Sequence, residues 1–449
     1  MNDVQFLNVK NSIFPLDCAY LPISRGKLLV SQSHAVFCSV NHDEVEGLTS
    51  FIQGDTTEIS EDIKQRLEIH GFFGPPREAK APSRTVQIQI TNGCNLSCTY
   101  CCTNSRNPRK SEITLEDAKN VVEITREKLG EGIRVAILGG EPLLKDWALD
   151  LANYAQGLGL DVTVFSNGVP LADENIARQC AESCKKGVKF RLSLAGPVKD
   201  LCDAKSGEPR YDAVIAGINY LYAHGGECII DLMLFPEHVD STAAHLHELR
   251  GKLPAGVPIA FGIAYVSGRE VGQDLFESRR ALEESLDRIA FEAGEIIAAV
   301  KPAPLTERRE GCTCALGHHL HVRSDGSLFN CFKMEEKVGH LTEEGFENAL
   351  DFVRSNPNPA SGLQKCSDCV LNTICGSGCR SDNYLYTGNP ELPLCDTWRV
   401  RVISELLADD WVSALEWPLH HLLSEAKNMG ISCPDKIEPV IKSRHLIDT

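Results

Sequence analysis

The amino-acid sequence predicts an α/β protein built around a parallel β-sheet and followed by a cysteine-rich region. Strand-like and helix-like patterns alternate regularly across residues 85–303, and such alternation is typical of a parallel sheet with right-handed crossovers. The 449 residues include 19 cysteines, many of them clustered at positions 94–102 and 312–395. A chain of this length has room for two or three domains with a large core.

Charge and hydropathy exclude several classes of protein. The chain has 45 Lys and Arg against 62 Asp and Glu, a formal charge of -17, which argues against nucleic acid as the main partner. No apolar run approaches the roughly 20 residues of a membrane span, and the N-terminus lacks a signal-peptide pattern. We therefore expect a cytoplasmic protein with no membrane partner. Disulfides are disfavoured in that compartment, so metal ligation is the economical use of many cysteines.

Residues 1–84 are expected to form a small α+β module. Two short runs, Gly26–Ser31 and 35–40, have the pattern of paired strands. Ser60 is a candidate N-cap for a helix that ends at Gly71. A hairpin with a helix suits a winged-helix-like module, and a cap on the N-terminal end of the central barrel is the alternative.

The central region is expected to contain six repeated strand–helix units. Thr114 and Asp117 give the first helix a start similar to a capping box. The predicted strands are 85–91, 133–138, 161–166, 188–194, 227–234 and 258–265. The predicted helices are 115–129, 145–157, 173–186, 211–224 and 241–251, and a longer amphipathic helix is expected at 275–300.

A loop with three cysteines follows the first predicted strand. Cys94, Cys98 and Cys101 have the spacing CxxxCxxC. Three thiolates can hold three irons of a cubane cluster and leave the fourth iron open, whereas four cysteines would close the site. A structural zinc site is the alternative, but it needs four ligands, and the loop offers only Cys102 as a fourth.

At these residues the sequence resembles the radical S-adenosylmethionine (SAM) superfamily. The resemblance implies a partial (β/α)6 TIM-like barrel in which Cys94, Cys98 and Cys101 bind a [4Fe-4S] cluster. It also implies that the open iron chelates SAM, and that an injected electron cleaves SAM to a 5′-deoxyadenosyl radical, which abstracts hydrogen from a substrate. Tyr100 matches the aromatic position near the adenine.

Further SAM contacts are implied by the same resemblance. Gly139, Gly140 and Glu141 match the superfamily's GGEP motif, in which the glutamate and the backbone meet the SAM amino group. Ser166 and Ser193 stand near the ends of the third and fourth strands, where polar contacts to SAM are common. Arg269 matches a recurring Gly-Arg at the carboxylate and ribose edge. The stretch 192–203 resembles an "SLDGP…HD" segment of peptide-modifying members but departs from it at position 195, which is alanine.

Eight cysteines follow the barrel region. They are Cys312, Cys314, Cys331, Cys366, Cys369, Cys375, Cys379 and Cys395. Eight thiolates suit two four-iron clusters or two zinc sites. Their ordered spacing resembles the SPASM extension of radical SAM enzymes, which implies two auxiliary [4Fe-4S] clusters.

The same resemblance assigns the ligands of each auxiliary cluster. The first cluster would take Cys331, Cys379 and Cys314, with Cys312 as a possible fourth ligand. The second would take Cys366, Cys369, Cys375 and Cys395. Because these thiolates complete the ligand sets, His318, His319 and His321 are interpreted as residues at the surface or beside the ligands.

The expected organisation is therefore an N-terminal module at 1–84, a radical SAM core at 85–303, a SPASM domain at 304–400 and a helical tail at 401–449. Members of this family act mainly on ribosomally synthesised peptides or proteins, and their N-terminal modules can hold a leader peptide. We predict a maturase of a precursor peptide that receives electrons from a flavodoxin or ferredoxin. The maturase would form a thioether or carbon–carbon crosslink, excise residues or modify a side chain.

Three alternatives stay open. A sulfatase-maturase-like enzyme would form formylglycine, but that family has a catalytic aspartate where this chain has Phe332. A non-catalytic Fe–S electron-transfer protein would not cleave SAM. A zinc-stabilised binding protein would contain no iron or sulfide.

Overall fold

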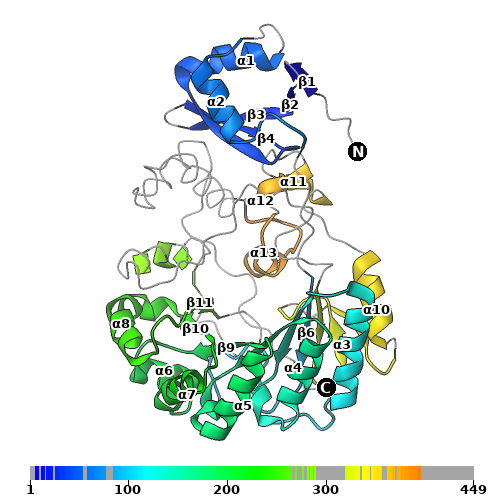
Figure 1. Cartoon of the computed structure of the whole chain (residues 1–449), viewed down its shortest axis with the longest axis vertical. Helices are drawn as coiled ribbons and strands as arrows, with labels where there is room; N and C mark the ends of the chain where they lie inside the picture. Colours follow the sequence, from blue (N-terminus) through cyan, green and yellow to red (C-terminus); the bar gives the residue numbers. More distant parts are fainter. Residues whose placement is uncertain are drawn as a thin grey trace. The chain divides into compact units, whose positions relative to one another are not determined.

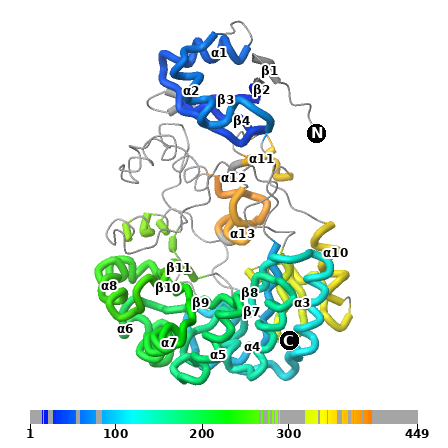
Figure 2. The backbone as a smooth tube through the Cα atoms, viewed as in Figure 1, coloured from blue at the N-terminus to red at the C-terminus, as the bar shows by residue number. Residues whose placement is uncertain are grey.

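The computed structural model describes residues 6–9, 12–15, 17–23, 26–53, 58–76, 84–264, 268–269, 276–277, 281–282, 284–286, 288–289, 319–333, 336–343, 345–355, 362–367, 369, 372–375 and 377–395. The chain divides into two compact units (Figure 2). Of the described residues, the larger unit contains those within 84–289 and 319–355, and the smaller unit contains those within 6–76 and 362–395.

The larger unit is built on a nine-stranded sheet (Figure 1) with the order β11-β10-β9-β8-β7-β6-β12-β13-β14. Its first seven strands in this order run parallel, and β13 and β14 continue the sheet antiparallel. The strands are β6 (Thr85–Gln89), β7 (Arg134–Leu138), β8 (Asp161–Ser166), β9 (Lys189–Leu194), β10 (Ile229–Leu234), β11 (Ile259–Ile263), β12 (His319–Val322), β13 (Ser327–Phe329) and β14 (Lys337–His340).

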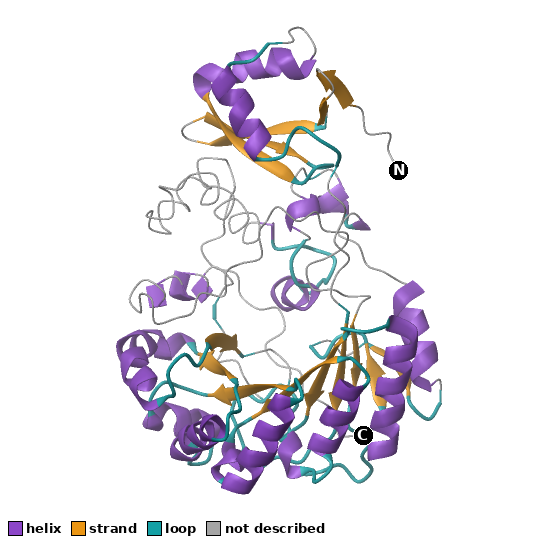
Figure 3. Ribbon diagram, in the orientation of Figure 1, coloured by secondary structure: helices purple, strands orange, loops and turns teal. Residues whose placement is uncertain are grey.

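Helices cover one face of this curved sheet (Figure 3). They are α3 (Leu115–Leu129), α4 (Ala148–Gly157), α5 (Glu174–Lys185), α6 (Lys199–Ser206), α7 (Tyr211–Ala223) and α8 (Val239–Lys252), and α10 (Gly345–Ser355) follows the last strand. Thr114 is the N-cap of helix α3, and its hydroxyl accepts a hydrogen bond from the Asp117 backbone in a capping box. Apolar residues of the sheet and helices form one continuous core.

The opposite face of the sheet carries several polar side chains. Val86 and Ile88 of β6 are buried in the core, so alternation along the strand directs Gln87 and Gln89 away from the helices. The same alternation places Arg191 of β9 and Asp231 of β10 on this face. The two form an ion pair in which Arg191 Nε donates to Asp231 Oδ2 at 2.9 Å and Nη2 donates to Oδ1.

The predicted fold class is confirmed. The six predicted strands and the five helices between them are all present and differ from the observed elements only at their ends. The short helix α6 and the continuation of the sheet through β12–β14 were not predicted. The helix predicted at 275–300 lies mainly outside the described residues, and the tail at 401–449 lies wholly outside them.

The smaller unit contains a three-stranded antiparallel sheet of the order β3-β4-β5. Its N-terminal elements are β1 (Phe6–Val9), β2 (Ser12–Pro15), β3 (Cys18–Ile23), β4 (Gly26–Ser31), β5 (Val36–Asn41), α1 (Val45–Gln53) and α2 (Glu61–Ile69). The predicted hairpin is β4–β5, and the predicted helix is α2, capped by Ser60. The Phe14 ring packs on Phe51 and Phe72 at centroid distances of 5.4 and 5.7 Å.

Three short helices complete the described part of the smaller unit. They are α11 (Gln364–Ser367), α12 (Asn372–Cys375) and α13 (Arg380–Thr387). Across the described segments of both units, no helix combines the length and the apolar character needed to cross a bilayer.

Candidate cluster and cofactor site

The three-cysteine loop leaves the C-terminal end of β6, where the neighbouring parallel strands also end. Cys94, Cys98 and Cys101 are all half-buried. The Cys94 backbone N–H donates to the Arg106 carbonyl at 3.0 Å, and the Cys101 N–H donates to the Cys98 carbonyl at 3.3 Å. The loop backbone is therefore folded on itself, with its three thiols near one another.

Gly140 lies directly against the start of this loop. The Gly140 N–H donates to the Thr91 carbonyl at 2.7 Å, and the Glu141 N–H donates to the Gly93 carbonyl at 2.9 Å. A Cβ atom on Gly140 would lie 2.4 Å from the Gly93 oxygen, which is far inside ordinary contact. Gly139 and Gly140 were predicted to lie close to a ligand. They also allow the loop that follows β7 to pack closely on the cysteine loop.

Glu112 fixes the first residues of the loop. Its carboxylate accepts hydrogen bonds from the Asn92 backbone at 2.7 Å and the Thr91 hydroxyl at 2.9 Å, and it pairs with Lys145 at 2.9 Å. Burial alone would raise the pKa of Glu112. The Asn92 and Lys145 bonds outweigh burial and hold that pKa below its usual value.

Arg269 holds the middle of the loop. Its guanidinium donates to the carbonyls of Cys98 and Ser105, both at 2.6 Å, and its backbone N–H donates to the Cys101 carbonyl at 3.0 Å. The preceding residue, Gly268, has φ +90° and leaves no room for a side chain beside the Cys101 carbonyl. The structure therefore places the predicted SAM contact Arg269 against the loop itself.

Glu141 is completely buried at the C-terminal end of β7. Its Oε1 accepts from the Leu143 backbone at 3.0 Å and the Ser166 hydroxyl at 2.8 Å, and its Oε2 accepts from the Asn167 backbone at 2.6 Å. An ionised carboxylate offers about four acceptor positions. These three donors occupy three of them, and the fourth can accept a hydrogen bond from a cation. Burial raises the pKa of Glu141 to about 7. A bound ammonium group would favour the ionised form.

Asn167 and Arg210 belong to the same cluster of side chains, although neither was predicted as a site residue. The Asn167 amide donates to Asn95 Oδ1 at 2.7 Å and lies 3.8 Å from the Cys94 sulfur. Arg210 donates to the Asn167 carbonyl at 3.4 Å and to the Tyr100 hydroxyl at 3.5 Å.

Arg210 is 1% exposed, and its Nε has no hydrogen-bond partner among the described residues. A buried cation normally needs a partner of opposite charge. The Arg210 charge also acts on the Cys98 thiol. Burial raises the pKa of this thiol, and the nearby Arg210 charge reduces the size of that rise. This environment suits a bound anion.

The donor set fits the predicted cluster. Burial raises the pKa of Cys94 to about 11, so this thiol stays protonated at neutral pH unless a metal takes the thiolate. No three His, Cys, Asp or Glu side chains in the described segments converge as ligands of one metal ion. A four-iron cubane spreads its ligands over separate corners and needs no such convergence. When bound, such a cluster would supply the electron for reductive cleavage of SAM.

Of the remaining predicted SAM contacts, Tyr100 lies on the cysteine loop and Ser193 lies near the end of β9. The ring of Tyr100 packs on Phe235 at a centroid distance of 5.1 Å. Ser193 is half-buried on β9, in register with Asp231 of β10. Ser166, at the end of β8, donates its hydroxyl hydrogen bond to Glu141.

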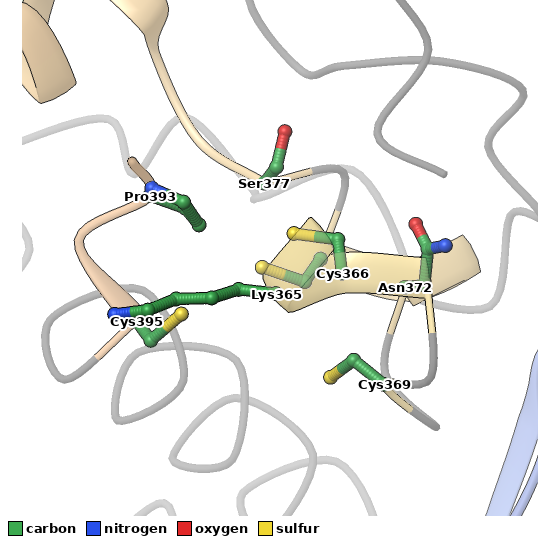
Figure 4. A pocket seen from close by; sticks show the side chains of 8 residues that line it. Lys365, Cys366, Cys369, Asn372, Ser377, Pro393 and Cys395 are labelled. Atoms are coloured by element: carbon green, nitrogen blue, oxygen red, sulfur yellow. The ribbon is translucent and has the colours of Figure 1, made fainter. Parts of the chain in front are cut away.

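Four of the predicted auxiliary-cluster cysteines surround one cavity in the smaller unit (Figure 4). The cavity is lined by Cys366, Cys369, Cys375 and Cys395, with Lys365, Asn372, Ser377 and Pro393. Burial raises the pKa of Cys375 to about 12, and the other three thiols add to this shift. Four thiols around one cavity match the four ligands of a closed four-iron cluster.

The other predicted auxiliary ligands belong to different parts of the chain. Cys331 belongs to the larger unit and Cys379 to the smaller one, and Cys312 and Cys314 lie outside the described residues. His321 is 2% exposed, which excludes a place at the surface and leaves the predicted alternative of a place beside the ligands. Its ring packs against Phe332, next to Cys331, at a centroid distance of 6.3 Å. His318 is outside the described residues, and His319 is half-buried.

Comparisons with known proteins agree with this geometry. The model of the radical SAM superfamily matches residues 88–249. The AdoMet-dependent heme synthase of Oleidesulfovibrio alaskensis is 24% identical over 363 residues, which cover 72% of this chain and 91% of that protein. The mycofactocin maturase MftC of Mycolicibacterium smegmatis is 28% identical over 323 residues, which cover 67% of this chain and 79% of that protein.

A solved structure supports the fold. Native anSMEcpe with bound AdoMet superposes with a TM-score of 0.53 at 16% identity, over 77% of this chain and 99% of that chain. This similarity shows a shared fold. The match over residues 88–249 shows that this part of the chain is a radical SAM domain, a kind of domain that uses SAM and a [4Fe-4S] cluster.

Proposed function

We propose that this radical SAM enzyme carries three [4Fe-4S] clusters and modifies a ribosomally synthesised precursor peptide. Cys94, Cys98 and Cys101 hold the SAM-binding cluster. Glu141 receives the SAM ammonium group at its remaining acceptor position, and Arg210 balances the negative charge of the cluster and the SAM carboxylate. The support is the buried arrangement of one carboxylate and one guanidinium around the three-cysteine loop.

The second auxiliary cluster is assigned to Cys366, Cys369, Cys375 and Cys395, which line one cavity. The first is assigned to Cys331 and Cys379 with Cys314 and Cys312, on the basis of sequence spacing alone. Residues 304–400 would thus form a SPASM region that serves both clusters. Its electrons would come from a flavodoxin or ferredoxin in the cytoplasm.

The peptide substrate is supported by the N-terminal module. Its sheet ends at β3 on one side and at β5 on the other. β5 is almost wholly buried, whereas the described side chains Cys18–Tyr20 of β3 are half-buried. An extended peptide can pair with such an open strand edge through main-chain hydrogen bonds. We assign the leader segment of the precursor to the edge of β3.

The sheet face opposite the helices is the proposed surface for the reacting segment. The Arg191–Asp231 ion pair offers both charges there, and the Arg191 guanidinium lies 5.5 Å from the centre of the Phe165 ring. A face with donors, acceptors and an aromatic ring suits a peptide better than a purely apolar substrate. The deoxyadenosyl radical would take one hydrogen atom from the substrate and leave as 5′-deoxyadenosine.

Short peptides encoded beside the gene provide the test. Each would be incubated anaerobically with reconstituted enzyme, SAM and dithionite, and its mass measured before and after. A peptide whose mass changes only with SAM, and whose binding weakens when Tyr20 of β3 is replaced by proline, would support the proposal. Proline cannot donate to a strand partner. The control is Glu68→Ala, a change at an exposed position of α2, away from the sheet edge. Peptides whose masses all stay unchanged would contradict the proposal.

A second candidate is an enzyme that forms heme. The observation that favours it is the match to AdoMet-dependent heme synthases over 91% and 96% of their lengths. Heme formation from an iron-porphyrin substrate, followed by visible absorption, would decide for this candidate. Formylglycine formation has less support, since the residue after Cys331 is Phe332, whose ring packs on His321.

A further inference from the structure

The turn between β4 and β5 contacts the segment that carries the auxiliary-cluster cysteines. Gln32 lies in this turn, and its side-chain Nε2 donates to the Cys369 carbonyl at 3.3 Å. In return, the Thr373 hydroxyl donates to the Gln32 carbonyl at 2.9 Å. These two hydrogen bonds join parts of one compact unit that are 337 and 341 residues apart in the sequence.

The turn is held firmly by its own contacts. The Asp17 carboxylate accepts hydrogen bonds from the Ser31 hydroxyl at 2.8 Å, the Ser33 backbone at 2.5 Å and the Ser33 hydroxyl at 2.9 Å. Ala35 is buried with a φ of +50°, a conformation that costs energy for a residue with a Cβ. A strained residue persists only where its surroundings determine the backbone, so the turn offers a fixed position to Gln32.

Both bonds reach the segment between two proposed ligands of one cluster. The Cys369 carbonyl also accepts from the Asn372 backbone at 2.9 Å, and Thr373 lies in α12, which ends at Cys375. Gln32 therefore contacts the chain at the two places that position the backbone of Cys369 and Cys375. Cys366, by contrast, belongs to the separate short helix α11.

We propose that Gln32 is a positioning residue for the second auxiliary cluster, so that the N-terminal module forms part of that cluster's site. The inference depends on the proposed function, because it takes the four-cysteine cavity as a cluster site. Hydrogen bonding and solvent exposure around a cluster set its reduction potential. Loosening the Cys369–Cys375 segment should change both the potential and the retention of this cluster, while the SAM-binding cluster in the other unit keeps its properties.

Single substitutions separate the two bonds. Gln32→Ala removes the bond to Cys369 but keeps the Gln32 carbonyl that Thr373 contacts, and Thr373→Val removes the other bond at nearly constant shape. Thr373→Ser keeps the hydroxyl and is the conservative control. Gln65→Ala, at an exposed position of α2, is the control for a glutamine change in the same module.

The measurements are the rate of iron loss to a chelator and the midpoint potentials followed by electron paramagnetic resonance. The iron that Cys366→Ala removes identifies the second auxiliary cluster. We expect Gln32→Ala and Thr373→Val each to release this iron about fivefold faster, as the loss of one hydrogen bond implies, and to shift its potential. Gln65→Ala and Thr373→Ser should match the wild type.

Two results would overturn the inference. If the wild type holds the cluster and both variants retain it with unchanged potential, Gln32 does not position its ligands. If the wild type binds no iron through Cys366, the proposed three-cluster function fails, and this inference fails with it. The Cys366→Ala comparison in the wild-type background distinguishes the two cases.

Discussion

Replacing Gly140 with alanine should displace the cysteine loop. The added Cβ would lie 2.4 and 2.7 Å from the Gly93 carbonyl oxygen and carbon, and 2.8 Å from the Asn92 oxygen. All three are backbone atoms, which cannot rotate away as a side chain would. Reaching an ordinary contact of 3.4 Å requires the two loops to separate by about 1 Å.

That separation has a cost that follows from the structure. It would break the Gly140–Thr91 and Glu141–Gly93 backbone hydrogen bonds, now 2.7 and 2.9 Å long, at about 1 kcal/mol each. Overpacking adds about 1–3 kcal/mol. We therefore expect Gly140→Ala to lower the free energy of unfolding by about 3–5 kcal/mol and to reduce iron retention by the Cys94–Cys101 loop.

Urea unfolding of the apoprotein and iron analysis after anaerobic reconstitution measure the two effects. Gly251→Ala is the matched control, because Gly251 lies in α8 and a Cβ added there would have no neighbouring atom within 4 Å. That control should gain about 0.5–1 kcal/mol. A Gly140→Ala protein that kept its iron and unfolded within about 1 kcal/mol of the wild type, where about 3–5 kcal/mol is expected, would refute the reasoning.

Three further predictions follow from the charges around the loop. The folded state lowers the pKa of Glu112, so the ionised carboxylate stabilises the fold above pH 4.5. This stabilisation is lost as the pH falls through the folded pKa. In urea unfolding at different pH values, Glu112→Gln should remove this part of the acid dependence. Arg210→Met should lower the reduction potential of the SAM-binding cluster by on the order of 100 mV. A unit charge at roughly 6 Å contributes about 3 kcal/mol at a dielectric constant of about 20. A redox titration that finds an unchanged potential would contradict this. The pKa of Cys94 is raised to about 11, so protons compete with iron for its thiolate. Iron loss to a chelator should therefore accelerate as the pH falls. The rate should rise by up to about tenfold per pH unit for each ligand that is reprotonated.

The sequence predicted those features best that depend on residues close together in the chain. Strand–helix alternation located β6–β11, and the spacing of Cys94, Cys98 and Cys101 located the loop at the end of β6. Local pattern also found the capping box at Thr114, because its hydrogen bonds lie within four residues.

Long-range relations left no such signal. Arg210 meets Tyr100 and Asn167 only after three separate elements have folded, so its burial had no local signature. The pairing of β12 with β6 joins residues more than 200 positions apart. His321 stands between Leu320 and Val322, and that short run alone did not reveal that its imidazole would be buried.

Cleavage of SAM is the most direct test of the proposed three-cluster enzyme. Anaerobically reconstituted protein would be reduced with dithionite in the presence of SAM, and 5′-deoxyadenosine and iron would be counted per chain. We expect about twelve irons, from three four-iron clusters, and 5′-deoxyadenosine that disappears in Cys98→Ala. Zinc in place of iron, or 5′-deoxyadenosine formation that survives Cys98→Ala, would contradict the proposal.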